Sequence, residues 1–273
     1  MILDYIVWNF EPKIFPHSSV HIAWYGLLFA LGIYLAYLTV NYTFKKEKIQ
    51  AGLLDKISIW LIVALIVGAR LGHCLFYEPE YYLSNPLRIL KTWEGGLASH
   101  GAAIALPIAV IILARKYKFN PIWFLDRLVI GVAIAGALIR LGNFCNSEIY
   151  GVETTLPWGV IFLRNGETVP KHPTQFYEAF MCIITYITLL IIYKKKNYKP
   201  KNGFLFGLFL VMIFVFRFFV EFIKNPQVDF EQTMTLNMGQ ILSIPLILLG
   251  VFFIIWSQCK HPKISSNAKV TSK

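Results

Sequence analysis

The sequence predicts an all-α integral membrane protein, and its composition and the placement of its charges carry this prediction. Of its 273 residues, 56% are hydrophobic and only 15% are charged, whereas soluble chains carry about 25% charged residues. The mean hydropathy is +0.57. About seven apolar segments are long enough to cross a bilayer, which needs roughly 20 helical residues. Basic residues gather in short runs between these segments.

The apolar segments, taken in order, define the expected transmembrane helices. We predict spans at residues 21–43, 57–77, 98–114, 122–145, 175–193, 203–223 and 238–256. Lysine and arginine clusters follow the first, third, fifth and last of them, within residues 45–48, 115–118, 194–201 and 260–273. With the N-terminus outside, every cluster lies inside. The positive-inside rule therefore predicts an N-out, C-in topology.

The connecting segments complete the expected organisation. Residues 78–96, with two prolines and a tryptophan, are expected to form an interfacial arm. Residues 146–173 are rich in glycine and proline and predict a small extracytoplasmic cap. Residues 1–256 then form one transmembrane catalytic domain, and residues 257–273 form a basic cytoplasmic tail. The N-terminus has acidic Asp4 and no basic region, so it does not have the pattern of a cleaved signal peptide.

Charge and cysteine usage exclude several other classes. The net charge of +11 is spread over the short runs that flank apolar segments, which favours membrane orientation over nucleic-acid binding. The four cysteines form no CxxC motif and no cluster with histidine. We therefore expect no metal site, no disulfide framework and no nucleic-acid partner.

Ionisable residues inside the predicted spans are the first indication of a functional site, because charge in a membrane segment is costly. Six stand out: Arg70, His73, His100, Arg140, Arg217 and Glu221. At 1.5 Å of rise per residue, all of them lie toward the outer ends of their segments. Tyr25 and Asn143 lie at the same depth. Groups from several helices are therefore expected to converge under the outer leaflet.

Arginine offers a planar fork of donors that suits phosphate, and phospholipid headgroups occupy this depth. The pattern thus predicts a lipid-handling site that faces outward. Simpler interpretations remain: Arg70 snorkels to the interface, Arg217 and Glu221 form only an intrahelical pair, and His100 is a structural polar cap. We interpret Glu178 as more structural than catalytic. Asp126 predicts a local ion pair with the adjacent Arg127, away from this chemistry.

Six blocks of the sequence resemble those of the prolipoprotein diacylglyceryl transferase family. They are HIAWYGLLFALG at 21–32, GLASHGAAIA at 96–105, RLGNFCNSEIYG at 140–151, HPTQFYEA at 172–179, FRFFVEFIKNPQ at 216–227 and MGQILSIP at 238–245. The resemblance implies a seven-span enzyme of the bacterial inner or plasma membrane. It implies transfer of the diacylglyceryl group of phosphatidylglycerol to the lipobox cysteine of a prolipoprotein. A thioether forms, glycerol phosphate leaves, and no cofactor is implied.

The same resemblance assigns residues to roles. The family's essential arginine falls on Arg140, and its second arginine falls on Arg217. The remaining matched positions are Tyr25, His100, Asp126, Asn143, Glu148, Gly151 and Glu221. With the chemistry above, His100 becomes the candidate base, and the two arginines become candidates to bind the leaving phosphate. Asn143 and Tyr25 would orient the headgroup, Glu221 would fix the fork of Arg217, and Arg70 would be an extra contact.

The sequence departs from the family pattern at a few positions. Ile213 stands where a tyrosine is common, Lys224 replaces an arginine, and Cys145 replaces an aliphatic residue. Other classes also remain: a lipid or anion transporter that uses the same arginines, a membrane scaffold, or an acyltransferase with Cys145 as nucleophile. The absence of an evident internal repeat disfavours the transporter.

Overall fold

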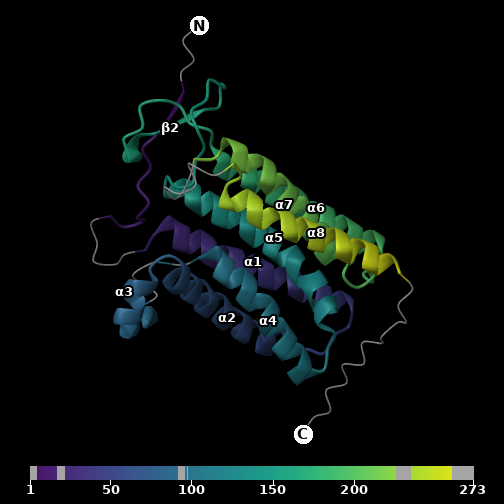
Figure 1. Cartoon of the computed structure of the whole chain (residues 1–273). Helices are drawn as coiled ribbons and strands as arrows, with labels where there is room; N and C mark the ends of the chain where they lie inside the picture. The colour runs from purple at the N-terminus through teal and green to yellow at the C-terminus, as the bar shows by residue number, and fades with distance from the viewer. Residues whose placement is uncertain (1–4, 17–21, 92–95, 97, 226–234, 260–273) are drawn as a thin grey trace. The chain divides into compact units, whose positions relative to one another are not determined.

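Long helices dominate the structure, and each corresponds to one of the predicted segments (Figure 1). A computed structural model describes residues 5–16, 22–91, 96, 98–225 and 235–259, without the side chains of Ser99 and His100. The helices are α1 (Trp24–Lys46), α2 (Leu53–Phe76), α4 (Ser99–Tyr117), α5 (Pro121–Cys145), α6 (Thr174–Lys195), α7 (Phe204–Val220) and α8 (Met238–Gln258). Their ends lie within four residues of the predicted ones.

Six of these helices have the length and hydropathy needed to cross a bilayer. They are α1, α2, α5, α6, α8 and α7 extended by the 3-10 turn η4 (Glu221–Ile223), as judged over the described residues. α4 is not among the six. The helical membrane class is therefore confirmed. The total number of crossings and the N-out orientation stay predictions.

The chain forms two compact units. The described part of the first unit comprises residues up to Thr43 and from Asp126 to residue 259, which include most of α1 and of α5, and α6 to α8. The second unit comprises the described residues from Phe44 to Leu125. It holds α2, α4, the short helix α3 (Pro79–Ser84) and the 3-10 turn η1 (Pro86–Leu90). Residues 92–95 of the predicted arm and most of the predicted tail lie outside the described residues.

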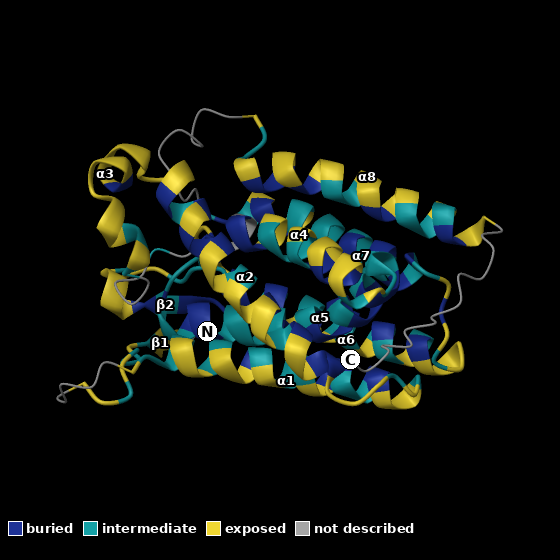
Figure 2. Ribbon diagram, turned by 90° about the horizontal axis from the view of Figure 1, so that it is seen from below, coloured by how far each residue is buried: buried dark blue, intermediate teal, exposed yellow. Residues whose placement is uncertain are grey.

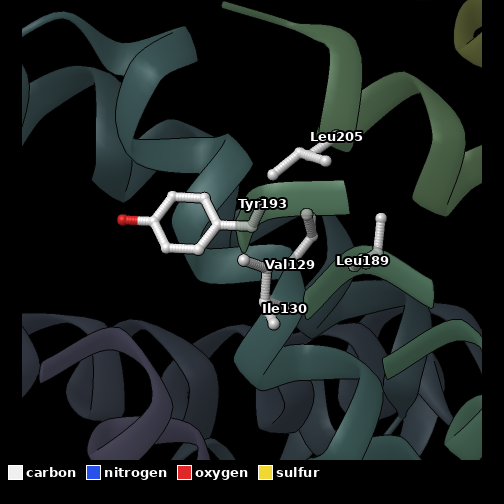
Figure 3. Close-up of a cluster of buried hydrophobic side chains, with 5 residues drawn as sticks. All are labelled: Val129, Ile130, Leu189, Tyr193 and Leu205. Atoms are coloured by element: carbon white, nitrogen blue, oxygen red, sulfur yellow. The ribbon is translucent and has the colours of Figure 1, made fainter. Parts of the chain in front are cut away.

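Within the first unit, α5, α6 and α7 meet in a cluster of buried side chains (Figure 3). Val129 and Ile130 come from α5, Leu189 and Tyr193 from α6, and Leu205 from α7. Lipid tails are as apolar as leucine, so tight van der Waals packing holds such helices together. Figure 2 shows exposed residues along the outward faces of α1 and α8, where apolar side chains can meet hydrocarbon.

Close backbone approach supports the packing in both units. On α7, a Cβ added at Gly207 would lie 2.6 Å from the carbonyl oxygen of Gly250 on α8. On α2, a Cβ at Gly72 would lie 2.7 Å from Cα of Gly101 on α4. Only glycine allows these helices to approach so closely. Small residues at such contacts are common between membrane helices.

The helix ends are satisfied by specific polar groups. α8 begins with a capping box in which the side chains of Asn237 and Gln240 each bond the other's backbone N–H. α7 begins under the carboxylate of Asp126, which accepts the N–H of Gly203 at 2.7 Å and of Phe206 at 2.8 Å. The predicted ion pair of Asp126 with Arg127 is confirmed at 3.6 Å. Asp126 thus also satisfies orphan donors of a distant helix.

The predicted cap over residues 146–173 contains a strand, β2 (Val160–Phe162), and a 3-10 turn, η3 (Leu163–Asn165). β2 pairs in parallel with a strand near the N-terminus, β1 (Ile6–Trp8). An ion pair of 2.6 Å between Arg164 and Glu11 holds the two segments together a few residues further on. This N-terminal strand is not among the elements predicted from the sequence.

Candidate active site

The C-terminal end of α5 carries the first group of predicted site residues. Arg140 Nη1 donates to Asn143 Oδ1 at 3.5 Å, and Asn143 Nδ2 donates to Glu148 Oε1 at 2.7 Å. The ring of Tyr25 packs against Gly142, where an added Cβ would lie 2.9 Å from the ring. Arg140, Asn143 and Glu148 therefore form one connected polar string, with Tyr25 beside it.

The start of α6 places a buried carboxylate against this string. Glu178 Oε2 lies 3.2 Å from Arg140 Nε, and Glu178 Oε1 lies 3.3 Å from Lys224 Nζ. The contact to Arg140 is an ion pair by distance, although Oε2 accepts no well-oriented hydrogen bond among the described residues. Glu178 is only 6% exposed and Lys224 only 5%. Charges so deeply buried are tolerated only when they are paired.

Lys224 continues the charge pairing to the end of α7. Its ammonium also lies 3.3 Å from Glu221 Oε1, and the same oxygen lies 3.3 Å from Arg217 Nε. The predicted pair of Arg217 and Glu221 is therefore present. The result is a chain of alternating charges that runs Arg140, Glu178, Lys224, Glu221, Arg217; we call these five residues the charge chain.

The two ends of the charge chain differ from its middle. The side chains of Arg140 and Arg217 are 20% and 32% exposed, whereas those of the three middle residues are 9% exposed or less. In both arginines the Nε side of the guanidinium faces a carboxylate. Three cations and two carboxylates leave one positive charge in excess along the chain. A partly exposed, positively charged pair of forks favours an anionic ligand.

The N-terminal end of α8 fixes Glu221 from the other side. Asn237 Nδ2 donates to Glu221 Oε2 at 3.2 Å and to the backbone oxygen of Glu221 at 3.1 Å. A Cβ at Gly239 would clash with the Glu221 carboxyl group, so glycine is required for this approach. Both oxygens of Glu221 are therefore engaged, and its carboxylate holds Arg217 in one orientation.

Gly151 joins the cap to the charge chain. Its N–H donates to His172 O at 2.8 Å, and the next N–H, of Val152, donates to Ile223 O at 2.9 Å. A Cβ on Gly151 would clash with Ile223 O, so any other residue would push these segments apart. Because Ile223 directly precedes Lys224, this backbone contact positions the central cation of the chain.

A strained turn over residues 147–151 leads from α5 into the cap. Ser147 and Ile149 both have positive φ, of 55° and 62°, a conformation that costs free energy in residues other than glycine. Hydrogen bonds over-determine the turn: Gln175 Nε2 donates to Glu148 O at 2.7 Å, and Thr174 Oγ1 donates to Ile149 O at 2.9 Å. The first turn of α6 thus holds Glu148 in place.

The cap outside the apolar helices has its own titrating groups. Burial lowers the pKa of Lys171, but the carboxylate of Glu167 at 3.1 Å and that of Glu153 outweigh burial and raise its pKa overall. Burial lowers the pKa of His172, whose Nδ1 lies 3.2 Å from the hydroxyl oxygen of Tyr177. His172 therefore favours the neutral form.

Most of the predicted site residues come together in the first unit. The structure connects Arg140, Asn143, Glu148, Gly151, Arg217 and Glu221 through the contacts described above, at the end of α5 to α8 that carries the cap (Figure 1). The side chain of His100, the predicted base, lies outside the described residues. Arg70 belongs to the second unit.

The guanidinium of Arg70 serves the predicted arm. It donates to the backbone oxygens of Arg88 at 2.7 Å, Ile89 at 2.9 Å and Gly96 at 3.3 Å. It also lies over the ring of Tyr82, 5.0 Å from the centroid. With an exposure of 2%, Arg70 does not snorkel; it anchors the arm.

Sequence reasoning missed the central members of the charge chain. From the sequence we interpret Glu178 as structural, and Lys224 stands out only as a replacement for arginine. Sequence position could have predicted a role for both residues. Glu178 is an acid at the predicted depth of Arg140. Lys224 follows Glu221 at i,i+3, a spacing that places two side chains on one face of a helix. The sequence signal for Asn237 was weaker: it is an asparagine directly before an apolar segment, where a helix N-cap is common.

The fold and the site together define a class: a multi-pass helical membrane protein with paired charges buried at one end of its helices. A family profile described as "Prolipoprotein diacylglyceryl transferase" matches residues 12–256.

Relatives named phosphatidylglycerol–prolipoprotein diacylglyceryl transferase match over nearly the whole chain. One from Tolumonas auensis is 42% identical and covers 92% of this chain and 97% of its own. One from Bacteroides fragilis is 41% identical, with coverages of 92% and 95%. One from Porphyromonas gingivalis is 44% identical, with coverages of 92% and 94%. The chain belongs to the prolipoprotein diacylglyceryl transferase family, and it is a transferase of lipoprotein biosynthesis.

Proposed function

We propose that this chain transfers the diacylglyceryl group of phosphatidylglycerol to the thiol of the lipobox cysteine of prolipoproteins. The thiolate sulfur forms a bond to the glyceryl C3 carbon, and the bond from C3 to the phosphate oxygen breaks. The electron pair leaves with glycerol phosphate, and the thiol proton passes to a base. The names of the relatives supply the two substrates, and the charge chain supplies the means to bind the phosphate.

The observation that carries the proposal is the fixed orientation of two arginine forks. Glu178 faces Arg140 Nε at 3.2 Å, and Glu221 faces Arg217 Nε at 3.3 Å. Each carboxylate thus occupies the Nε side of a guanidinium and leaves Nη donors for a ligand, apart from the 3.5 Å contact of Arg140 Nη1 with Asn143. Charge on the phosphate grows as the C–O bond breaks, and preorganised donors that meet this charge lower the barrier by about 3–4 kcal/mol each.

The remaining residues position the arginines or the headgroup. Asn143 and Tyr25 lie beside Arg140 and would hydrogen-bond the glycerol headgroup. Glu148 holds Asn143 at 2.7 Å, and Gly151 allows the cap to approach the charge chain. Arg70 is left out of the phosphate site, because backbone carbonyls of the arm already engage its donors.

The thiol still needs a base, since a cysteine with a pKa of about 8.5 is only partly ionised near neutrality. We assign this role to His100, whose ordinary pKa lies near working pH. His100→Gln is expected to lower the rate and to recover part of it at higher pH, where more thiol ionises. A loss that does not change with pH would assign His100 to positioning instead.

The site is proposed to face the outer leaflet of the bacterial inner or plasma membrane. This placement rests on the positive-inside distribution of lysine and arginine. The cap over residues 146–173 would then lie outside, above the charge chain.

The test combines purified protein, phosphatidylglycerol and a peptide with a lipobox cysteine, and mass spectrometry detects the diacylglyceryl adduct. Wild type should form it, and Arg140→Ala should lose at least about a hundredfold in rate. Arg164→Ala is the matched control, because Arg164 is paired to Glu11 in the cap and should keep full activity. Wild-type turnover by Arg140→Ala would remove the charge chain from the site. No adduct from folded wild type would discard the reaction and favour a lipid transporter.

A further inference from the structure

A second crevice opens in the first unit, away from the charge chain. It has a volume of ≈ 490 Å³ and lies between α1, α5 and α6. Its lining residues are mostly apolar with one cation at the end: Leu35, Leu38, Thr39, Tyr42, Ile134, Tyr186, Leu190 and Lys194. A volume of this size is typical of pockets that hold small organic ligands.

The crevice and the charge chain lie at opposite ends of the same helices. Lys194 follows Glu178 by 16 residues along α6, which corresponds to about 24 Å of helix at 1.5 Å per residue. α1 runs the same way, from Tyr25 beside Gly142 to Tyr42 in the crevice. The crevice is therefore a separate site and belongs to the other leaflet of the bilayer.

The walls of the crevice are held in place by the core. Tyr42, Tyr186 and Leu190 all pack against the buried cluster shown in Figure 3. Thr39 Oγ1 lies 3.4 Å from the hydroxyl oxygen of Tyr186, which ties α1 to α6 within the crevice. Tyr193 of the cluster donates from its hydroxyl to Thr43 O at 3.3 Å, which ties the same helices one turn further on. The crevice is thus a fixed feature of the packing.

The positive charge at the end of the crevice favours an anionic ligand. The crevice ends at Lys194, the one cation among its lining residues. Lysines at the end of an apolar helix lie at the level of the lipid headgroups. From Tyr186 to Lys194 the helix rises about 12 Å, close to the roughly 15 Å of hydrocarbon in one leaflet. An apolar cleft of one leaflet's depth with a cation at its mouth matches an acyl chain below an anionic headgroup.

We propose that this crevice binds one anionic phospholipid of the leaflet opposite the reaction site. An acyl chain lies over Leu35, Leu38 and Leu190, and the phosphate lies at the ammonium group of Lys194. The lipid fills the gap between α1 and α6, and its phosphate neutralises the charge of Lys194.

The experiment uses the full chain in nanodiscs that contain traces of phospholipids with a photoactivatable acyl chain. One probe carries a phosphatidylglycerol headgroup and the other carries phosphatidylcholine with the same chains. After irradiation, mass spectrometry maps the labelled residues. This position-resolved readout separates the crevice from the reaction site, where phosphatidylglycerol also binds in our proposal.

We expect the anionic probe to label residues 35–42 and 186–194 about fivefold more than the zwitterionic probe, as one lysine near a membrane surface contributes. Lys194→Gln should remove most of this preference. Lys195→Gln, which changes a neighbouring lysine outside the crevice, should retain it. Leu190→Trp, which fills the crevice, should abolish the label, whereas Ile191→Trp on the exposed face should not.

Equal labelling by both probes, or equal effects of Lys194→Gln and Lys195→Gln, would overturn the proposal, because the crevice would then hold bulk lipid without selection. A crevice that stays unlabelled while the protein is dimeric in solution would also overturn it, and would place a second copy there. Thermal unfolding of each variant establishes that it is folded before it is labelled.

Discussion

Glu178→Gln is expected to destabilise the protein strongly, because it removes the carboxylate between Arg140 and Lys224. Glutamine has nearly the same shape, so packing is kept and only the charge is lost. Arg140 Nε then loses its partner at 3.2 Å, and Lys224 keeps Glu221 alone. The charge chain would hold three cations and one carboxylate.

The magnitude follows from burial. Removing one partner of a buried ion pair costs about 3–5 kcal/mol. The lower end applies here, since the side chain of Arg140 is 20% exposed and water can take up part of its charge. About 3 kcal/mol corresponds to a fall in Tm of about 6–12 °C in a chain of this size.

The assay is thermal unfolding in mild detergent, followed by tryptophan fluorescence. Glu153→Gln is the matched control, because its carboxylate is 70% exposed and 3.4 Å from Lys171; such a pair contributes less than about 1 kcal/mol. Adding Lys224→Met to Glu178→Gln should restore part of the stability, because this second change removes the most buried cation of the charge chain. A fall in Tm no larger than that of Glu153→Gln, or a double variant less stable than the single one, would refute the reasoning.

Three further predictions concern the helix ends and the cap. Asp126→Ala should cost at least about 3 kcal/mol, since the first N–H groups of α7 lose their acceptor and the buried Arg127 loses its paired charge; Asp126→Asn keeps an acceptor oxygen and should cost less, and chemical unfolding measures both. Gly151→Ala should lower transfer activity and Tm together, because the new Cβ clashes with Ile223 O; unchanged values would contradict the assigned contact. Burial lowers the pKa of His172 below its ordinary value of 6.5, so the unfolded chain binds more protons and stability falls as the pH drops through that value. His172→Gln should flatten this part of a Tm-against-pH curve, and identical curves would contradict it.

The long helices were predictable from the sequence because their signal is local. Each needs only a continuous apolar run, and the observed ends fall within four residues of the predicted ones. The pair of Arg217 and Glu221 was predictable for the same reason, since i,i+4 spacing places two side chains together on any helix. The resemblance of short blocks to a known family then placed Arg140 and Asn143 in one site.

Other features depend on contacts between residues far apart in the chain. Lys224 meets Glu178 across 46 residues of sequence, and Asp126 caps α7 through the N–H of Gly203, 77 residues later. No periodicity connects such positions. In a hydropathy profile a buried acid only lowers the mean value of its segment, and the profile does not indicate the residue that pairs with it. The sequence predicts a structural role for Glu178, but only the fold brings Arg140 and Lys224 to it.

The sequence by itself determined the membrane class and the helices, because hydropathy acts along the chain. Only the tertiary structure decided how those charges are neutralised. It placed Lys224 between two carboxylates, gave Arg70 to the arm, and paired an N-terminal strand with β2. The physical reason is that a buried charge must find a partner wherever the fold brings one within reach, and that partner need not be near in sequence.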